Sequence, residues 1–261
     1  MTTINLEYPK SWTELDQREL YALLWCMANV QKLTEHTAFI DSDDYSIQTW
    51  AMIATRRIFA RNMILVYTPY ADGYLVKYRK KEYYITPGQV AALLDNVRWM
   101  REIPKEPVRL DLVGRFDAID ADLTGLPFGK WLEIENLWQG YNITHDDGLL
   151  RQIGEILYPG IEGRLFNEAE VLGVFYWIAS VKQMFALRFP SFFKPTGADG
   201  DGAPVDFNTL QRAADAQIRA LTKGDVTKED FIYDTDTTRA LTELDAQAKE
   251  YEEITKKYGK H

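Results

Sequence analysis

The sequence has little cysteine and little histidine, and it lacks the common catalytic motifs. The single cysteine, Cys26, excludes an intramolecular disulfide and a zinc site built from several cysteines. Three histidines, one of them the last residue, offer little for a histidine-based metal site or catalytic centre. A glycine-rich phosphate loop and the motifs G-x-S-x-G, H-E-x-x-H and C-x-x-C are missing. We therefore predict a protein without catalytic residues, bound metal or cofactor.

Long apolar runs are missing as well. The longest one, residues 171–181, ends at Lys182 and Gln183 and is far shorter than the roughly 20 residues of a membrane-spanning helix. Residues 1–9 include Glu7 and have no apolar segment of the kind found in secretory signals. From these two observations we expect a cytoplasmic protein that does not enter a membrane.

The composition that is present is typical of a folded protein. The chain of 261 residues is 46% hydrophobic, 26% charged and 13% aromatic, which excludes wholesale disorder and suits one large domain or two small ones. Its formal net charge is -9, with a pI of about 5.0. This acidic balance argues against a dedicated binder of nucleic acid or of anionic membranes.

Apolar residues recur at helical spacing over most of the chain. A capping box at Ser11, or a second one at Thr13, predicts the start of a first helix. Asn167 is the expected N-cap of a long, mostly buried helix over residues 167–189. Further helices are expected at residues 46–62, 87–99, 128–141, 147–157 and 236–257.

The middle of the chain changes to the alternating pattern of β-strands. Tyrosine and β-branched residues predict strands at residues 63–67, 74–78, 82–86 and 108–112. The expected fold is therefore mainly α, or α+β by strict count. It has a helical body with a small antiparallel β element near residues 63–112 and a C-terminal helical appendage.

A linker is expected between the body and this appendage. Residues 194–204 read KPTGADGDGAP, a composition rich in glycine, proline and small polar residues. We therefore divide the chain into a mainly helical body at residues 1–193, a flexible linker at 194–204 and a C-terminal helical module at 205–261.

The last predicted helix carries a narrow apolar stripe. Its members are spaced 3-4-3-4-3 along the helix, which is the spacing of a short coiled-coil seam: Leu241, Leu244, Ala248, Tyr251, Thr255 and Tyr258. We predict that Leu241, Leu244, Ala248 and Tyr251 bind a partner protein. Packing of the same stripe on the main body is an equally open alternative.

Two tryptophans are second choices for partner binding. Trp131 and Trp138 lie on the expected helix at residues 128–141. Most tryptophans at such spacing belong to a core, so they rank below the stripe of the last helix.

Carboxylates provide an alternative, enzymatic interpretation. Asp117, Asp120 and Asp122, or Glu135 beside the two tryptophans, can serve a hydrolase that depends on a divalent cation. We favour solvated loop residues for the aspartates, and for Glu135 a bond to neighbouring backbone or arginine. His145 and Asp146 resemble half a metal site, but a capping box from Thr144 explains them better.

A basic hairpin provides a third interpretation. Its charges are Arg56, Arg57, Arg61, Lys77, Arg79, Lys80 and Lys81, with Tyr78, Tyr83 and Tyr84 among them. Basic and aromatic residues together can bind single-stranded nucleic acid. The net charge of -9 opposes this interpretation and favours a solvated surface or an acidic protein partner.

Several stretches, taken together, resemble uncharacterised phage- and prophage-borne proteins encoded among tail genes. They include SWTELDQRELYALL, YLVKYRKKEYYIT, LPFGKWLEIENLWQGY, VLGVFYWIASVKQMFALRFPSFF and the final IRALTKGDVTKEDFIYDTDTTRALTELDAQAKEYEE. The resemblance implies a non-enzymatic tail assembly chaperone or tail-associated protein. Its implied partners are other phage tail or assembly proteins, in the host cytoplasm or on the virion. The oligomeric state stays open.

Overall fold

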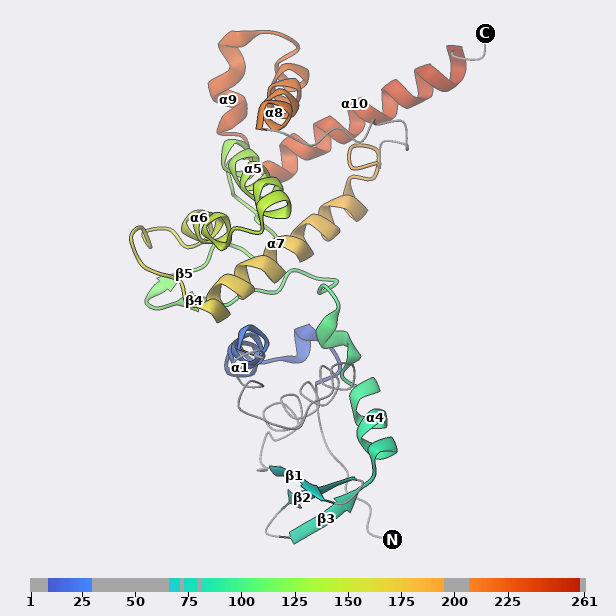
Figure 1. Cartoon of the computed structure of the whole chain (residues 1–261). Coiled ribbons are helices and arrows are strands. Elements are labelled where there is room, and N and C mark those ends of the chain that lie inside the picture. Colours follow the sequence, from blue (N-terminus) through green and yellow to red (C-terminus); the bar gives the residue numbers. More distant parts are fainter. Residues whose placement is uncertain (1–8, 30–65, 71–72, 79–80, 195–206, 259–261) are drawn as a thin grey trace. The chain divides into compact units, whose positions relative to one another are not determined.

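The computed structural model describes residues 9–29, 66–70, 73–78, 81–194 and 207–258 (Figure 1). The chain divides into two compact units. The first comprises Met1–Pro104 with Asn167–Gly173, and the second comprises Lys105–Phe166 with Val174–His261. The fold is mainly α with a small antiparallel β element, as the sequence predicted. None of the helices in the described parts is long and apolar enough to span a membrane.

The first helix of the first unit, α1 (Gln17–Ala28), begins later than the sequence suggested. Its capping box is formed by Asp16 and Glu19, and the Asp16 carboxylate accepts hydrogen bonds from two backbone N–H groups. Ser11 instead precedes a short 3-10 turn, η1 (Trp12–Glu14). Asp16 is the better cap because its charged side chain reaches two free donors at once.

The β element of the first unit is a three-stranded antiparallel sheet in the order β1-β2-β3. Its strands are β1 (Val66–Tyr70), β2 (Gly73–Tyr78) and β3 (Lys81–Ile85). The strands expected at 74–78 and 82–86 are thus confirmed. Residues 63–65 of the remaining expected strand, and the expected helix at 46–62, lie outside the described residues.

Two further elements follow the sheet. Helix α4 (Pro87–Asp95) leads to the 3-10 turn η2 (Arg98–Arg101). The Trp12 indole N–H donates to the carbonyl oxygens of Trp99 and Glu102, at 3.0 and 3.1 Å. The Trp12 and Trp99 rings meet edge to face at 5.6 Å. These contacts bind the segment before α1 to the end of the β-α4-η2 segment.

The second unit is built from helices. They are α5 (Phe128–Thr144), α6 (Asp147–Leu157), the part of α7 (Glu168–Arg188) from Val174 onward, α8 (Phe207–Thr222), α9 (Glu229–Tyr233) and α10 (Thr237–Tyr258), with the turn η3 (Val226–Lys228) before α9. The core contains Trp131, Tyr158, Trp177 and Phe185, all of which are almost fully buried. Trp131 and Phe185 meet edge to face at 5.0 Å.

The prediction of a strand at residues 108–112 is wrong for most of that segment. A two-stranded ladder forms further along, between β4 (Leu112–Val113) and β5 (Phe116–Asp117). The carbonyl of Leu110 accepts instead from the hydroxyl of Tyr158, at 2.9 Å. This part of the backbone thus bonds to a buried side chain rather than to a neighbouring strand.

The C-terminal helices are part of the second unit rather than a separate appendage. The backbone N–H of Phe128, at the start of α5, donates to the carbonyl of Thr235 at 2.8 Å. Thr237, at the start of α10, donates to the carbonyl of Leu126 through its backbone N–H at 2.9 Å and its hydroxyl at 2.6 Å. The division expected at residues 193 and 205 therefore differs from the one observed. The expected linker itself is described only at Lys194.

Candidate functional site

The apolar stripe of α10 has two parts with opposite surroundings. Leu241 is 0% exposed and Leu244 is 5% exposed, so both belong to the core of the second unit. Ala248 is half-buried. Tyr251 is 73% exposed and Ile254, one turn further, is 57% exposed. In Figure 1 this last part of α10 extends beyond α5, α8 and α9.

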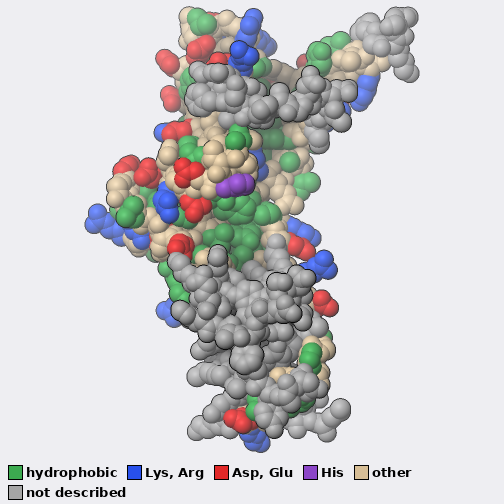
Figure 2. All heavy atoms as spheres, viewed as in Figure 1, with side chains coloured by type: hydrophobic (Ala, Val, Ile, Leu, Met, Phe, Trp, Pro, Cys, Tyr) green, Lys and Arg blue, Asp and Glu red, His purple; other side chains and the backbone are tan. Residues whose placement is uncertain are grey.

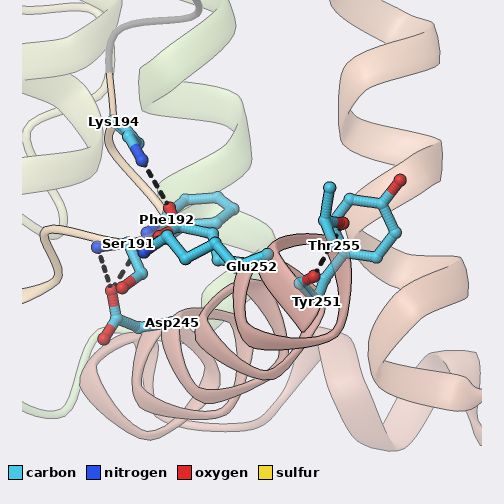
Figure 3. A network of polar contacts seen from close by, with 8 residues as sticks. Ser191, Phe192, Lys194, Asp245, Tyr251, Glu252 and Thr255 are labelled. Carbon is cyan, nitrogen blue, oxygen red and sulfur yellow. Dashed lines mark hydrogen bonds and ion pairs between the residues drawn. The ribbon is translucent and has the colours of Figure 1, made fainter. Parts of the chain in front are cut away.

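A polar network holds α10 against the segment that follows α7 (Figure 3). One oxygen of the Asp245 carboxylate accepts from the backbone N–H groups of Ser191 and Phe192, at 2.8 and 3.0 Å. Two turns further, Glu252 accepts from the Lys194 ammonium at 2.9 Å. The hydrogen bond from Lys194 lowers the pKa of Glu252, so this carboxylate stays ionised at neutral pH.

The network sets which side of α10 is left open. Asp245 and Glu252 are seven residues apart, which places them on the same side of the helix, two turns from each other. Figure 3 shows Tyr251 and Thr255 apart from Ser191 and Asp245, with Glu252 between them. We call Tyr251 and Ile254 the free stripe.

The two tryptophans predicted as second choices are buried. Trp131, at 2% exposed, is a core residue, with the Lys182 ammonium 5.8 Å from its ring centre. Trp138, at 8% exposed, borders an aromatic cluster with ring centres 5.4 Å from Phe175 and 6.0 Å from Tyr141. Neither tryptophan presents a large open face to a partner.

The aromatic cluster beside Trp138 includes two phenols. Burial raises the pKa of Tyr176 to about 12. Burial, together with the nearby charge of Asp147, also raises the pKa of Tyr141. Both hydroxyls therefore stay protonated at neutral pH, which makes them hydrogen-bond donors rather than bases.

Glu135, the candidate general acid, is bonded to two neighbouring side chains. Its two oxygens accept from the Lys182 ammonium and from the Gln139 amide, the latter at 2.8 Å. Glu135 is thus bonded, as expected, but its partners are lysine and glutamine rather than the predicted arginine or backbone group. Lys182 thereby joins α7 to α5 near the core.

The other candidate ligands are dispersed. Asp117 and Asp120 are exposed, and Asp122 accepts from the backbone N–H of Thr124 at 3.0 Å. His145 is exposed and has φ 54° as the C-cap of α5, while Asp146 is the N-cap of α6. The capping box expected from Thr144 is wrong, because the Asp146 side chain alone caps α6 by accepting from the backbone N–H of Gly148 at 2.8 Å. Within the described parts of the chain, no three metal-ligating side chains form a group.

Most of the basic hairpin lies outside the described residues, including Arg56, Arg57, Arg61, Arg79 and Lys80. Lys81 is exposed and Tyr84 is 44% exposed. Over the second unit, the face seen in Figure 2 has acidic and basic side chains interspersed with hydrophobic ones.

An open cleft of about 540 Å³ lies in the second unit and was not foreseen from the sequence. It is lined by the loop before α5, the first turns of α5, and both α6 and the loop that follows it. Its charged residues are Lys130, Glu133, Glu155 and Glu162, of which Lys130 and Glu133 form an ion pair at 2.9 Å. No spacing in the sequence predicts this cleft, because its walls come from separate segments.

Comparison of the chain with protein-family models, curated proteins and solved structures finds no match. The case for a function therefore rests on the geometry of α10 and on the sequence resemblance.

Proposed function

We propose that this protein acts by binding another protein through the free stripe of α10, without catalysing a reaction. The observation that carries the proposal is the contrast along one helix. Leu244 is buried at 5% exposed, whereas Tyr251 and Ile254 are 73% and 57% exposed. Large apolar side chains grouped on a rigid helix are typical of a docking surface for another helix.

The resemblance to phage tail-cluster proteins supports a choice of partner. A tail assembly chaperone recognises long hydrophobic or coiled-coil segments, and recognition of this kind needs an apolar helix face rather than catalytic groups. We therefore propose a phage tail or tail-assembly protein as the partner, and the host cytoplasm during assembly as the place of binding. Presence on the finished virion would distinguish a tail component from an assembly factor.

The expected energy of the contact is appreciable. Full burial of a large apolar side chain contributes about 1.5–3 kcal/mol. Tyr251 and Ile254 are 73% and 57% exposed, so burying what remains exposed contributes about 2–4 kcal/mol in total. Replacement of both by serine should weaken binding by roughly 100-fold or more.

Co-purification of the tagged full chain with the tail proteins encoded beside it tests the proposal. The variant Tyr251→Ser/Ile254→Ser should lose a tail protein that the unaltered chain retains. The matched control is Lys249→Ser/Glu253→Ser, two exposed positions on the opposite side of α10. Both variants contain two serines and keep the net charge, and the control loses at least as much helix propensity because Lys and Glu are better helix formers than Tyr and Ile.

The outcomes are distinct. Retention of a tail protein by the unaltered chain and the control, but not by the free-stripe variant, supports the proposal. Equal retention by all three proteins, or no tail protein with any of them, overturns it. Mass spectrometry of purified virions then separates an assembly factor, which is absent from them, from a tail component, which is present.

A further inference from the structure

We propose that the open cleft of the second unit binds a basic segment of another protein, whose arginine side chains pair with Glu155 and Glu162. The cleft is built from α5, α6 and the loops beside them. It shares no residue with the free stripe of α10, so it would be a second binding site on the same chain.

Hydrogen bonds hold the loop that forms one wall of the cleft. The backbone N–H of Ile119 donates to the carbonyl of Leu157, at the end of α6, at 3.0 Å. The backbone N–H of Gly125 donates to the Asp236 carboxylate at 2.8 Å. The cleft, of about 540 Å³, is therefore already ordered, and it has the size of a ligand site. Binding then requires little further ordering of the protein.

Part of the cleft wall is apolar. Ile119 and Ile156 are half-buried there, and Pro127 and Pro159 are exposed. Such a wall suits the methylene stem of arginine, which packs on apolar groups while its charged head pairs at the rim. A metal ion fits less well, because no three metal-ligating side chains form a group within the described residues.

The charges of the cleft do not balance. Lys130 is the one basic residue among the described residues that line it, and it is already paired with Glu133 at 2.9 Å. Glu155 and Glu162 are both exposed, and neither is bonded within the described part of the chain. The cleft therefore has an excess of two negative charges, which attracts a cation and disfavours an anion.

Glu155 also stands where helix energetics favours a base. It lies in the last turn of α6, which contains no basic residue. The end of a helix has a partial negative charge, so a carboxylate there is unfavourable. Pro159, four residues further, has no N–H to donate to the carbonyl of Glu155. A bound cation with several N–H donors would compensate for both effects.

Arginine in a peptide matches these features better than a small amine does. The guanidinium group has five N–H donors in one plane, so it can bond to a carboxylate and to a backbone carbonyl together. A peptide also places apolar side chains next to its arginines, where they can pack on Ile119 and Ile156. The cleft is open to solvent, so a chain can pass along it.

Fluorescence anisotropy of the full chain with a labelled hexapeptide of alternating arginine and leucine tests the proposal. The peptide should bind at low salt, and its affinity should fall as salt is added. The same peptide with citrulline in place of arginine keeps the shape of the side chain without its charge. It should bind at least about tenfold more weakly, since it cannot form the ion pairs.

A pair of variants assigns the binding to the cleft. Glu155→Gln/Glu162→Gln should weaken binding of the arginine peptide about tenfold, because both unpaired carboxylates are lost. The matched control is Glu250→Gln/Glu253→Gln, which removes the same charge at two exposed positions of α10 outside the cleft. The control should bind the peptide nearly as well as the unaltered chain.

Thermal melting separates a binding role of Glu155 from a structural one. Glu155→Gln removes a carboxylate from the C-terminal end of α6, so its Tm should equal or slightly exceed that of the unaltered chain. A marked fall in Tm would assign Glu155 to the stability of the fold and would overturn its role in binding.

The remaining outcomes decide the proposal. Absence of peptide binding at low salt overturns it, as does equal binding of the citrulline peptide. Equal loss with the cleft variant and the control also overturns it, because the peptide would then respond only to the net charge of the chain. Spermidine that displaces the labelled peptide at equal or lower concentration would make the cleft a site for small amines, and the peptide would be the wrong occupant.

Discussion

At the scale of single residues, burial decides what each member of the apolar stripe does. Leu241 and Leu244 follow the same spacing as Tyr251, yet they are core residues and it is not. Periodicity identifies an apolar face, but it does not tell whether the face packs on the same chain or on another one. This is why the stripe could be predicted from the sequence while its division into two parts could not.

The division predicts that aspartate has very different effects on stability at the two ends of the stripe. Leu244→Asp places an unpaired charge in the core, so it should lower the stability of the second unit by about 4 kcal/mol and its Tm by roughly 10 °C. Tyr251→Asp changes an exposed position and should shift Tm by only a degree or two. Thermal unfolding followed by circular dichroism measures both. A Leu244→Asp protein as stable as Tyr251→Asp would contradict the burial of Leu244.

At the scale of elements, one carboxylate connects the end of α7 to α10. Asp245 accepts from the backbone N–H groups of Ser191 and Phe192, so a single side chain satisfies two donors. No spacing in the sequence predicts this contact, because its partners are more than 50 residues apart. By contrast, the caps of α1 and α6 involve neighbours within three residues. Of the predicted caps, Thr13 and Thr144 lie within a turn of the observed ones, whereas Ser11 lies five residues before Asp16.

Removal of this connection should loosen α10. Asp245→Ala leaves both N–H groups without their acceptor and should cost about 1–3 kcal/mol. Asp245→Asn keeps an acceptor oxygen without its charge, so its cost should be intermediate. Chemical denaturation measures the difference, with Lys249→Ala, at an exposed position one turn further along α10, as the control. Equal stability of all three variants would show that the network does not hold the helix.

At the scale of the whole molecule, acid should weaken the fold through carboxylates that the folded state keeps ionised. Hydrogen bonds from Thr227 and Lys228 lower the pKa of Asp225 from 3.8 to about 2, and Lys194 lowers the pKa of Glu252. A carboxyl group whose pKa is lower in the folded state than in the unfolded state stabilises the fold at pH values above its ordinary pKa. This stabilisation is lost as the pH falls through the lowered pKa.

Tm should therefore fall as pH decreases from about 4.5 toward 2. The double variant Asp225→Asn/Glu252→Gln should be less stable than the unaltered chain at neutral pH. Its Tm should fall by less over this acid range. Calorimetry at several pH values measures the slope of Tm against pH for both proteins. Parallel slopes for the variant and the unaltered chain would contradict the assigned pKa shifts.

The long-range bonds at the start of α5 also bear on the order of events during synthesis. The hydroxyl of Thr237 reaches back to the carbonyl of Leu126 across 111 residues of sequence. A ribosome that has made α5, α6 and α7 has not yet released the chain needed to satisfy that carbonyl, and closure of so long a loop is slow. This contact can therefore form only after the chain through Thr237 has been made, and a chain terminated before Thr237 leaves the carbonyl of Leu126 without this partner.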